Sequence, residues 1–272
     1  MTSPRIPAPR RIGHQLRSDD FVRLLNNEPE ALRKIVYDHG VMHVSGLHLG
    51  DPWHDLERVA REFGAPIMYN GPAASACIEM SNSEGTPEAE RNKAVEWHQD
   101  DIHTHTPSSF TMLYGLEAPR DPPATLMADL MAAFGALDDA TQNDLDGLLV
   151  RHDPLGGIVD FDGEKRGRIG HQPGDTLVTH PLVLRHPATG FRQLFALAGT
   201  AAGIVGKTDD EAGQILRTLK RHAVSKEYVS EVRLKAGSFV VWDNLALLHT
   251  ATALPYSDKD GERRRVLRVS VR

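Results

Sequence analysis

The sequence predicts a mainly β fold with helical insertions, built on a double-stranded β-helix (jelly-roll) core. Strand-like segments occur at residues 41–46 and 110–116 and again throughout residues 229–271. Segments with helical periodicity lie before and between them. The chain has no internal repeat and no linker-like stretch, so we expect a single domain over residues 17–272. Residues 1–16 are expected to be a flexible N-terminal segment.

The first part of the domain is predicted to be helical on both sides of the strand at 41–46. Helices are expected at residues 17–27 and 29–39, and Pro29 suits the first turn of the second helix. A further helix at residues 52–63 would place its apolar side chains on one face. These helices are therefore expected to pack on the core.

The middle of the chain alternates between loops, strands and helices. Residues 81–92 are charged and contain Gly and Pro, which is typical of an exposed loop, and residues 95–100 are expected to follow as a strand edge. After the strand at 110–116, the stretch 126–149 is rich in Ala, Leu and Met and is expected to form two helices. Residues 153–175 are the longest expected loop.

The C-terminal part has the most regular pattern. Short strands are expected at residues 181–184 and 191–196, and an amphipathic helix at 209–222. The remaining expected strands lie at residues 229–234, 239–242, 245–250 and 264–271. Strands at both ends of the chain with helices between them are the reason for expecting a jelly roll.

The composition is that of a globular protein. The formal net charge is −6, which argues against nucleic acid as a partner, because such binding needs clustered Lys and Arg. No stretch approaches the roughly 20 apolar residues that span a bilayer, so no membrane partner is expected. The only cysteine is Cys77, which fits a cytoplasmic location. Assembly into a homo-oligomer is left open.

One segment offers a histidine and a carboxylate two residues apart. On a strand, that spacing places His98 and Asp100 on the same face. Another histidine, His249, follows on a later expected strand. Two histidines and one carboxylate are the ligand set of non-haem iron(II) oxygenases. A His-x-Asp pair alone is common in unrelated chains, so its meaning depends on the rest of the sequence.

The pair His103 and His105 is a rival metal site, since two histidines at that spacing also share a strand face. A cupin-type site would need a glutamate a few residues further on, and the next one is Glu117. A position at the rim of a pocket or on the surface is therefore favoured for both histidines.

Five motifs follow one another in a recognisable order. They are Trp97-His98-x-Asp100, Ala124-Thr125, His180-Pro181-Leu182-Val183 with His186-Pro187-Ala188-Thr189-Gly190, Trp242-Asp243-Asn244…His249, and Arg264-x-x-x-Arg268. In these motifs the chain resembles the taurine dioxygenase family, whose members, including the phenoxyacetate dioxygenases, depend on iron(II) and 2-oxoglutarate. The resemblance covers nearly the whole chain.

The resemblance implies a metal site and a co-substrate site. His98, Asp100 and His249 would bind Fe(II), with 2-oxoglutarate and O₂ as co-substrates. Thr125 and Arg264 would bind the far carboxylate of 2-oxoglutarate, which needs a cation once it is buried. The expected enzyme is a dioxygenase that hydroxylates a small organic molecule with release of succinate and CO₂.

The pair Arg264 and Arg268 also bears on how the substrate binds. Arg268 lies four residues after Arg264, so both face one side of a strand, and the family often uses the second arginine for an anionic group of the substrate. Arg265 would point the other way, unless the register is shifted by one residue and the roles are exchanged. The alternative for Arg268 is an ion pair with a protein carboxylate.

Three other residues are candidates to contact the far end of the substrate: Tyr69, His103 and Asp101. For Asp101 a solvated position is the favoured alternative. Tyr69 stands where taurine dioxygenases carry a sulfonate-binding histidine, and Ala94 stands where they carry an asparagine. Both departures argue against taurine itself as the substrate.

Other functions remain as alternatives. The same machinery can give desaturation, cyclisation or another oxidative outcome. A non-enzymatic jelly-roll binding protein would be expected to lack at least one of the metal-binding residues, whereas all three are present. An oxygenase acting on nucleic acid would need a broad basic face, which the negative charge disfavours.

Overall fold

The computed structural model describes residues 12–69, 75–83, 96–153, 157, 177–252 and 254–272. Most of the two loops expected at residues 81–92 and 153–175, and the first eleven residues, lie outside these ranges. Among the described helices, none combines the length and apolar character that crossing a bilayer requires.

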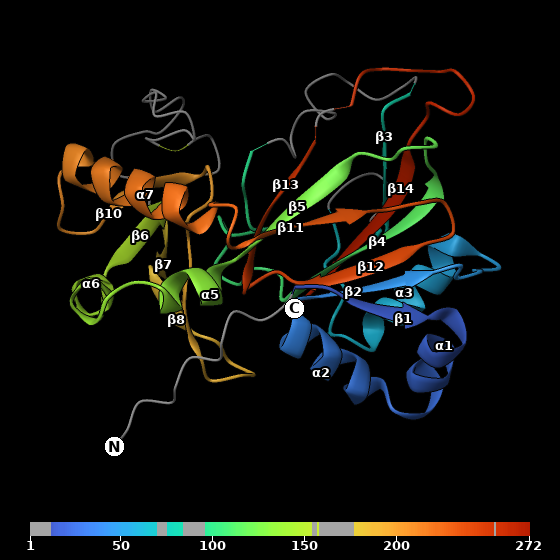
Figure 1. Ribbon diagram of the computed structural model, residues 1–272, viewed down its shortest axis with the longest axis horizontal. Coiled ribbons are helices and arrows are strands. Elements are labelled where there is room, and N and C mark those ends of the chain that lie inside the picture. Colours follow the sequence, from blue (N-terminus) through green and yellow to red (C-terminus); the bar gives the residue numbers. More distant parts are fainter. Residues whose placement is uncertain (1–11, 70–74, 84–95, 154–156, 158–176, 253) are drawn as a thin grey trace.

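A six-stranded sheet forms one wall of the core (Figure 1). Its neighbouring strands are antiparallel, except for the parallel pair β1 and β2. In sheet order the strands are β1 His14–Arg17, β2 Val41–Ser45, β12 Phe239–Asp243, β4 Phe110–Glu117, β14 Arg265–Val271 and β3 Ile78–Ser81.

A three-stranded sheet faces this wall and closes the jelly roll. Its strands, in sheet order, are β11 Val229–Arg233, β5 Ala124–Asp129 and β13 Leu247–Ala251. Met127 and Leu247 of this sheet pack against Val240, Trp242 and Val266 of the larger one, and each is at most 2% exposed. The predicted jelly-roll core is confirmed.

Three helices cover the outer face of the six-stranded sheet. They are α1 Ser18–Asn27, α2 Pro29–His39 and α3 Pro52–Arg61, as predicted. Phe21, Val36 and Val59 of these helices pack against Phe239 and Val241 of β12. Because β12 is buried on both faces, its sequence is continuously apolar rather than alternating.

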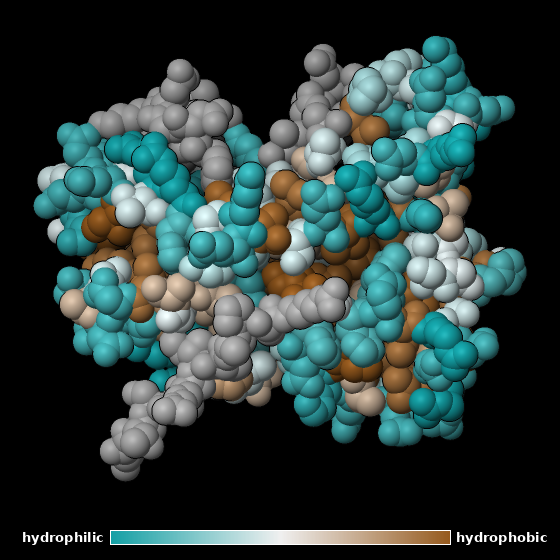
Figure 2. Space-filling model, viewed as in Figure 1, coloured by the Kyte–Doolittle hydropathy of each residue, from teal (hydrophilic) through white to brown (hydrophobic). Residues whose placement is uncertain are grey.

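The remaining elements lie beside the jelly roll, at the other end of the molecule (Figure 1). They pack on a separate apolar cluster under α7, whose N-terminus carries a capping box of Thr208 and Glu211. The elements are α5 Leu130–Gly135, α6 Asp139–Leu145, β6 Leu149–His152, β7 Val178–Pro181, β8 Val183–Arg185, β9 Arg192–Leu194, β10 Ala201–Ile204 and α7 Asp209–Ala223. Figure 2 shows a mostly hydrophilic face, with hydrophobic side chains gathered near its centre around β11 and β12.

The prediction of a helix from residue 126 was wrong. Residues 126–129 belong to a strand, not to a helix, because β5 is hydrogen-bonded on both sides, by β11 and β13. This pairing overrides the helical preference of Ala, Leu and Met. The helix begins only after Asp129, whose Oδ1 accepts hydrogen bonds from the backbone N–H groups of Met131 and Ala132. Strand β1 was not predicted, because its four residues are too few to show a clear pattern.

The close approach of β4 to the turn before β12 generates a prediction about stability. A Cβ atom on Gly115 would lie 2.3 Å from the backbone oxygen of Lys235. We expect Gly115→Ala to lower the free energy of unfolding by about 1–3 kcal/mol, measured by urea denaturation, because the backbone must shift. In the control Gly50→Ala, the nearest atom is Asp55 Oδ2 at 3.9 Å, and we expect a change within about 0.5 kcal/mol. Equal effects would contradict the packing described here.

Candidate metal centre and active site

The two histidines of the predicted site are joined through their backbones. The N–H of His98 donates to the oxygen of His249 at 2.8 Å, and the N–H of His249 donates back at 2.9 Å. Residues 96–100 form this isolated bridge and a turn, not the strand edge that the sequence predicted. The turn continues through Asp101, which has a positive φ of 57°. Asp100 therefore approaches the histidines because the chain turns, not because of strand alternation.

The side chains of His98, Asp100 and His249 converge on one point. Their ligand atoms all lie within 4.8 Å of one another, and they form the one group of three or more such residues within metal-binding reach in the described part of the chain. Nε2 of His98 lies 3.7 Å from Asp100 Oδ1, and Nε2 of His249 lies 3.7 Å from Asp100 Oδ2. This donor set suits a divalent transition metal.

Hydrogen bonding and burial leave both imidazoles ready to bind a metal. Nδ1 of His98 lies 2.6 Å from the backbone oxygen of Glu96. A carbonyl can only accept, so Nδ1 carries the proton and the lone pair of Nε2 is free. Burial and the neighbouring His98 lower the pKa of His249 to about 3, which keeps this side chain neutral. An edge-to-face contact with the Trp242 ring, 4.9 Å between centroids, helps to fix the orientation of the His249 ring.

Asp100 is ionised although it is buried. Burial disfavours its charged form, but the positive charge of Arg268, the two histidines and the Thr111 hydrogen bond hold the pKa of Asp100 well below its usual range. Nη2 of Arg268 lies 3.0 Å from Oδ1, and the Thr111 hydroxyl donates to Oδ2 at 2.6 Å. Thr111 also contacts Ser270 at 3.1 Å.

The terminal arginines lie on opposite sides of the last strand. Arg265 forms a two-pronged ion pair with Glu79, at 2.6 and 3.1 Å. Arg264 is held through its backbone N–H, which donates to Asn82 Oδ1 at 2.7 Å. Burial lowers the pKa of Arg264 to about 10, and no carboxylate of the described residues offsets this cost. The structure thus has the unshifted register, and on the inner side Arg264 has no ion-pair partner among the described residues.

Thr125 lies on the same face of its sheet as the metal-site histidine. It pairs with Ala251 across β5 and β13, while Met127 pairs with His249. Residues opposite one another on neighbouring strands share a face, and two residues correspond to roughly 7 Å along the strand. The half-buried Thr125 is therefore placed beside the metal centre, further along the barrel.

A family model extends these local observations to the whole chain. The model described as "Taurine catabolism dioxygenase TauD, TfdA family" matches residues 5–270. The chain belongs to this family.

Curated relatives within the TauD/TfdA family have several activities. The chain is 30% identical over 156 residues to an alpha-ketoglutarate-dependent 2,4-dichlorophenoxyacetate dioxygenase of Cupriavidus pinatubonensis, which covers 56% of this chain and 53% of that protein. It is 25% identical over 242 residues to an alkylsulfatase of Acinetobacter baylyi, which covers 85% and 72%. The matches to the first relatives span about half of their length.

Solved structures of the family share the fold. A taurine dioxygenase from Burkholderia xenovorans superposes with a TM-score of 0.74 over 98% of this chain and 91% of that one, at 24% identity. At this identity the likeness concerns the fold alone.

The predicted substrate residues gather only in part around the TauD/TfdA-type metal centre. Arg268, with a side chain 16% exposed, already pairs with Asp100 and lies 5.6 Å from the ring of Tyr69. Asp101 is partly buried beside them, while His103 is exposed. The anionic-substrate prediction assumed that Arg268 lacked a protein partner, and Asp100 supplies one.

Sequence reasoning missed Thr111 and Ser270. Both are fully buried and stand opposite one another on β4 and β14. Alternation along each expected strand places them on the inner side, but nothing in the sequence marks them as neighbours of Asp100.

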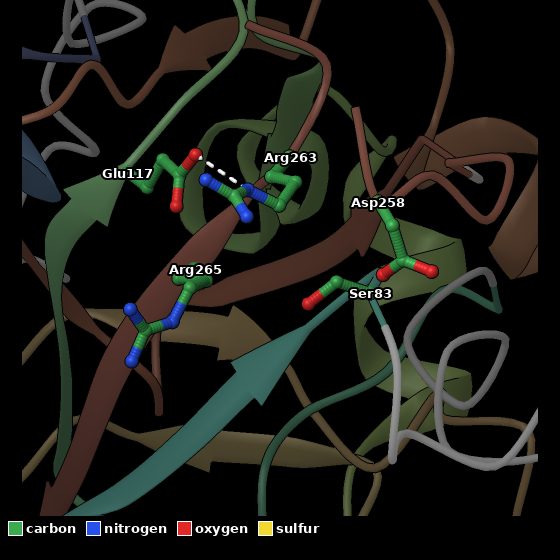
Figure 3. Close-up of a pocket in the computed structure, with 5 residues that line it drawn as sticks. All are labelled: Ser83, Glu117, Asp258, Arg263 and Arg265. Atoms are coloured by element: carbon green, nitrogen blue, oxygen red, sulfur yellow. Dashed lines mark hydrogen bonds and ion pairs between the residues drawn. The ribbon is translucent and has the colours of Figure 1, made fainter. Parts of the chain in front are cut away.

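A charged pocket lies apart from the triad. It measures about 370 Å³ and is lined by Ser83, Glu117, Asp258, Arg263 and Arg265 (Figure 3). Arg263 pairs with Glu117 at 2.9 Å, the contact drawn in the figure, so its charge is already balanced. No residue of the triad lines this pocket.

The geometry predicts one site for a divalent metal. We expect His98→Ala and His249→Ala to weaken Co²⁺ binding more than about 100-fold in calorimetric titrations. Loss of a residue that binds the metal costs more affinity than loss of a residue that only hydrogen-bonds to such a ligand. His103→Ala is the control, since His103 is exposed and away from the triad, and should bind Co²⁺ as wild type does. Undiminished binding in both triad variants would contradict the site.

Proposed function

We propose that the protein is a 2-oxoglutarate-dependent non-haem iron(II) dioxygenase that oxidises a small organic molecule. The observation that carries this proposal is a largely buried His98–Asp100–His249 triad together with Arg264, a cation that no carboxylate of the described residues pairs. One group suits a divalent metal and the other suits a carboxylate. Membership of the TauD/TfdA family supports the same conclusion.

His98, Asp100 and His249 would hold the iron. When bound, iron(II) supplies the redox chemistry with O₂ while 2-oxoglutarate is converted to succinate and CO₂. The protein keeps the His249 imidazole neutral and the Asp100 carboxylate ionised, so neither group has to lose a proton to bind the metal. The hydrogen bond of His98 to Glu96 and the Trp242 contact hold the rings in place.

Arg264 and Thr125 would bind the far carboxylate of 2-oxoglutarate. A buried guanidinium without a carboxylate partner is costly, and a dicarboxylate co-substrate removes that cost. The Thr125 hydroxyl on the facing sheet adds a neutral donor. Asn82 fixes the backbone of Arg264 at this position.

Hydroxylation of an anionic substrate is the outcome we propose. Arg268 and Tyr69 stand next to the metal ligands, where a substrate anion can share the guanidinium with Asp100. Asp101 and His103 would contact the other end of the molecule. The net charge of −6 favours such a small molecule over nucleic acid. A cytoplasmic location fits the single buried cysteine, Cys77.

A coupled assay tests the proposal. The protein, loaded anaerobically with iron(II), is mixed with 2-oxoglutarate, O₂ and a panel of small organic acids, and succinate is measured together with the oxidised product by mass spectrometry. We expect succinate to depend on the metal and to rise with one class of acid. Product mass distinguishes hydroxylation from desaturation or cyclisation. Absence of succinate under all conditions would contradict the proposal.

The two arginines before and at the start of β14 provide a matched pair of variants. Arg264→Ala should weaken 2-oxoglutarate binding by about 2–5 kcal/mol, the usual cost of removing one partner of a buried charge pair. Arg265→Ala should change it little, because Arg265 pairs with Glu79 on the other side. Anaerobic calorimetry measures both affinities, and the reverse order would show that the co-substrate lies elsewhere.

The substrate role of Arg268 has its own kinetic signature. Arg268→Gln should raise the KM for the primary substrate about tenfold or more, while 2-oxoglutarate affinity stays near wild type. Metal affinity should stay unchanged or increase, because a cation that competes for Asp100 is removed. An unchanged KM would show that Arg268 serves Asp100 and not the substrate.

A further inference from the structure

Two buried amide side chains fasten the segments that carry the three metal-site residues. Gln99 is 2% exposed and Asn244 is fully buried. Gln99 lies between His98 and Asp100, and Asn244 lies in the turn that leads from β12 into β13, the strand of His249. We call these two residues the amide clamp.

Asn244 holds the backbone of Asp100 at both its N–H and its carbonyl group. Its Oδ1 accepts from the N–H of Asp100 at 2.9 Å, and its Nδ2 donates to the oxygen of Asp100 at 3.0 Å. The same Nδ2 group donates to Ser108, to the backbone oxygen at 2.8 Å and to the hydroxyl at 3.0 Å. Both the oxygen and the NH₂ group of this amide are hydrogen-bonded, mostly to backbone groups, and three acceptors share its two N–H donors.

Gln99 makes the reciprocal connection. Its Nε2 donates to the backbone oxygens of Asn244 at 3.2 Å and Leu245 at 3.1 Å, and its Oε1 accepts from the N–H of Ala196 at 3.2 Å. Ala196 has a positive φ of 60°, a conformation that alanine rarely adopts. A third segment, after β9, is therefore tied to the same point.

The amide clamp holds a segment that lacks the regular backbone hydrogen bonds of a strand. Outside the His98–His249 bridge, residues 96–100 have no regular strand partner, and Asp100 stands in a turn. Without the hydrogen bonds of the amide clamp, the direction of the Asp100 carboxylate would depend on Thr111 and Arg268 alone. Arg268 has a long side chain, which can turn to another anion. The amide groups are neutral, so they fix the backbone of Asp100 without altering the charge of the site.

We propose that Gln99 and Asn244 are positioning residues that set the metal affinity of the triad by holding Asp100 and the β13 strand in one arrangement. This inference rests on the proposed metal centre. It assigns the clamp no contact with metal, co-substrate or substrate. The effect of removing it should appear in metal binding, beyond any general loss of stability.

The test compares Gln99→Met with Gln142→Met. Gln142 is also a buried glutamine, and its Nε2 donates to the backbone oxygens of Phe134 at 3.2 Å and Leu137 at 3.0 Å, far from the triad in the fold. Methionine keeps the approximate shape of each side chain and removes its hydrogen bonds. Asn244→Leu serves as the second clamp variant.

Two readouts are measured on each full-length protein: thermal unfolding without metal, and Co²⁺ affinity with the visible absorption of the bound ion. We expect both glutamine variants to lose comparable thermal stability. Co²⁺ affinity should fall about 10–100-fold in Gln99→Met and Asn244→Leu, and by less than twofold in Gln142→Met. The absorption of bound Co²⁺ should change in the clamp variants, because its geometry is relaxed.

The outcomes separate the two proposals. Co²⁺ affinity and absorption in Gln99→Met that match those of Gln142→Met would overturn the clamp and leave the metal centre intact. If Asn244→Leu does not fold, the glutamine pair decides alone. Failure of the wild-type protein to bind Co²⁺ would overturn the metal centre and the clamp together.

Discussion

The two hydrogen bonds between the backbones of His98 and His249 are the contact on which the site depends. They bring together two residues that lie far apart in the sequence and set both imidazoles on one side of the smaller sheet. Asp100 follows two residues later in a turn, so its position is determined by this bridge and by the side chains that hold the turn. Met127 and Trp242 next to the histidines are buried in the apolar layer between the two sheets, and close packing in such a layer limits movement of the histidines.

Charge balance explains the second half of the site. This half contains two arginines, Arg264 just before β14 and Arg268 within it, and one metal-site carboxylate, Asp100. The charge of Arg268 is compensated by Asp100. Burial lowers the pKa of Arg264, and no carboxylate of the described residues compensates its charge. A structure that retains such an imbalance is suited to a ligand that supplies the missing negative charge.

The sequence predicted the jelly roll, the covering helices and the three residues that converge, because these depend on apolar periodicity and on residue types with few alternative roles. The strand argument for His98 and Asp100 was wrong in detail, since a bridge and a turn do the work there. The helix expected from residue 126 was wrong because pairing on both edges of β5 outweighs local preference. Asn244 belongs to one of the sequence motifs, but its hydrogen bonds to Asp100, like the roles of Thr111 and Gln99, could not be predicted. Hydroxyl and amide side chains acquire their partners only when the sheets close.

A crystal structure of the protein grown anaerobically with iron(II) and 2-oxoglutarate tests the central claim most directly. Anomalous scattering at the iron edge locates the metal without assumptions about its ligands. The account predicts one strong peak bounded by His98, Asp100 and His249, with the far carboxylate of 2-oxoglutarate against Arg264 and Thr125. A metal peak elsewhere, such as at His103 and His105, or a dicarboxylate that leaves Arg264 unpaired, would contradict it.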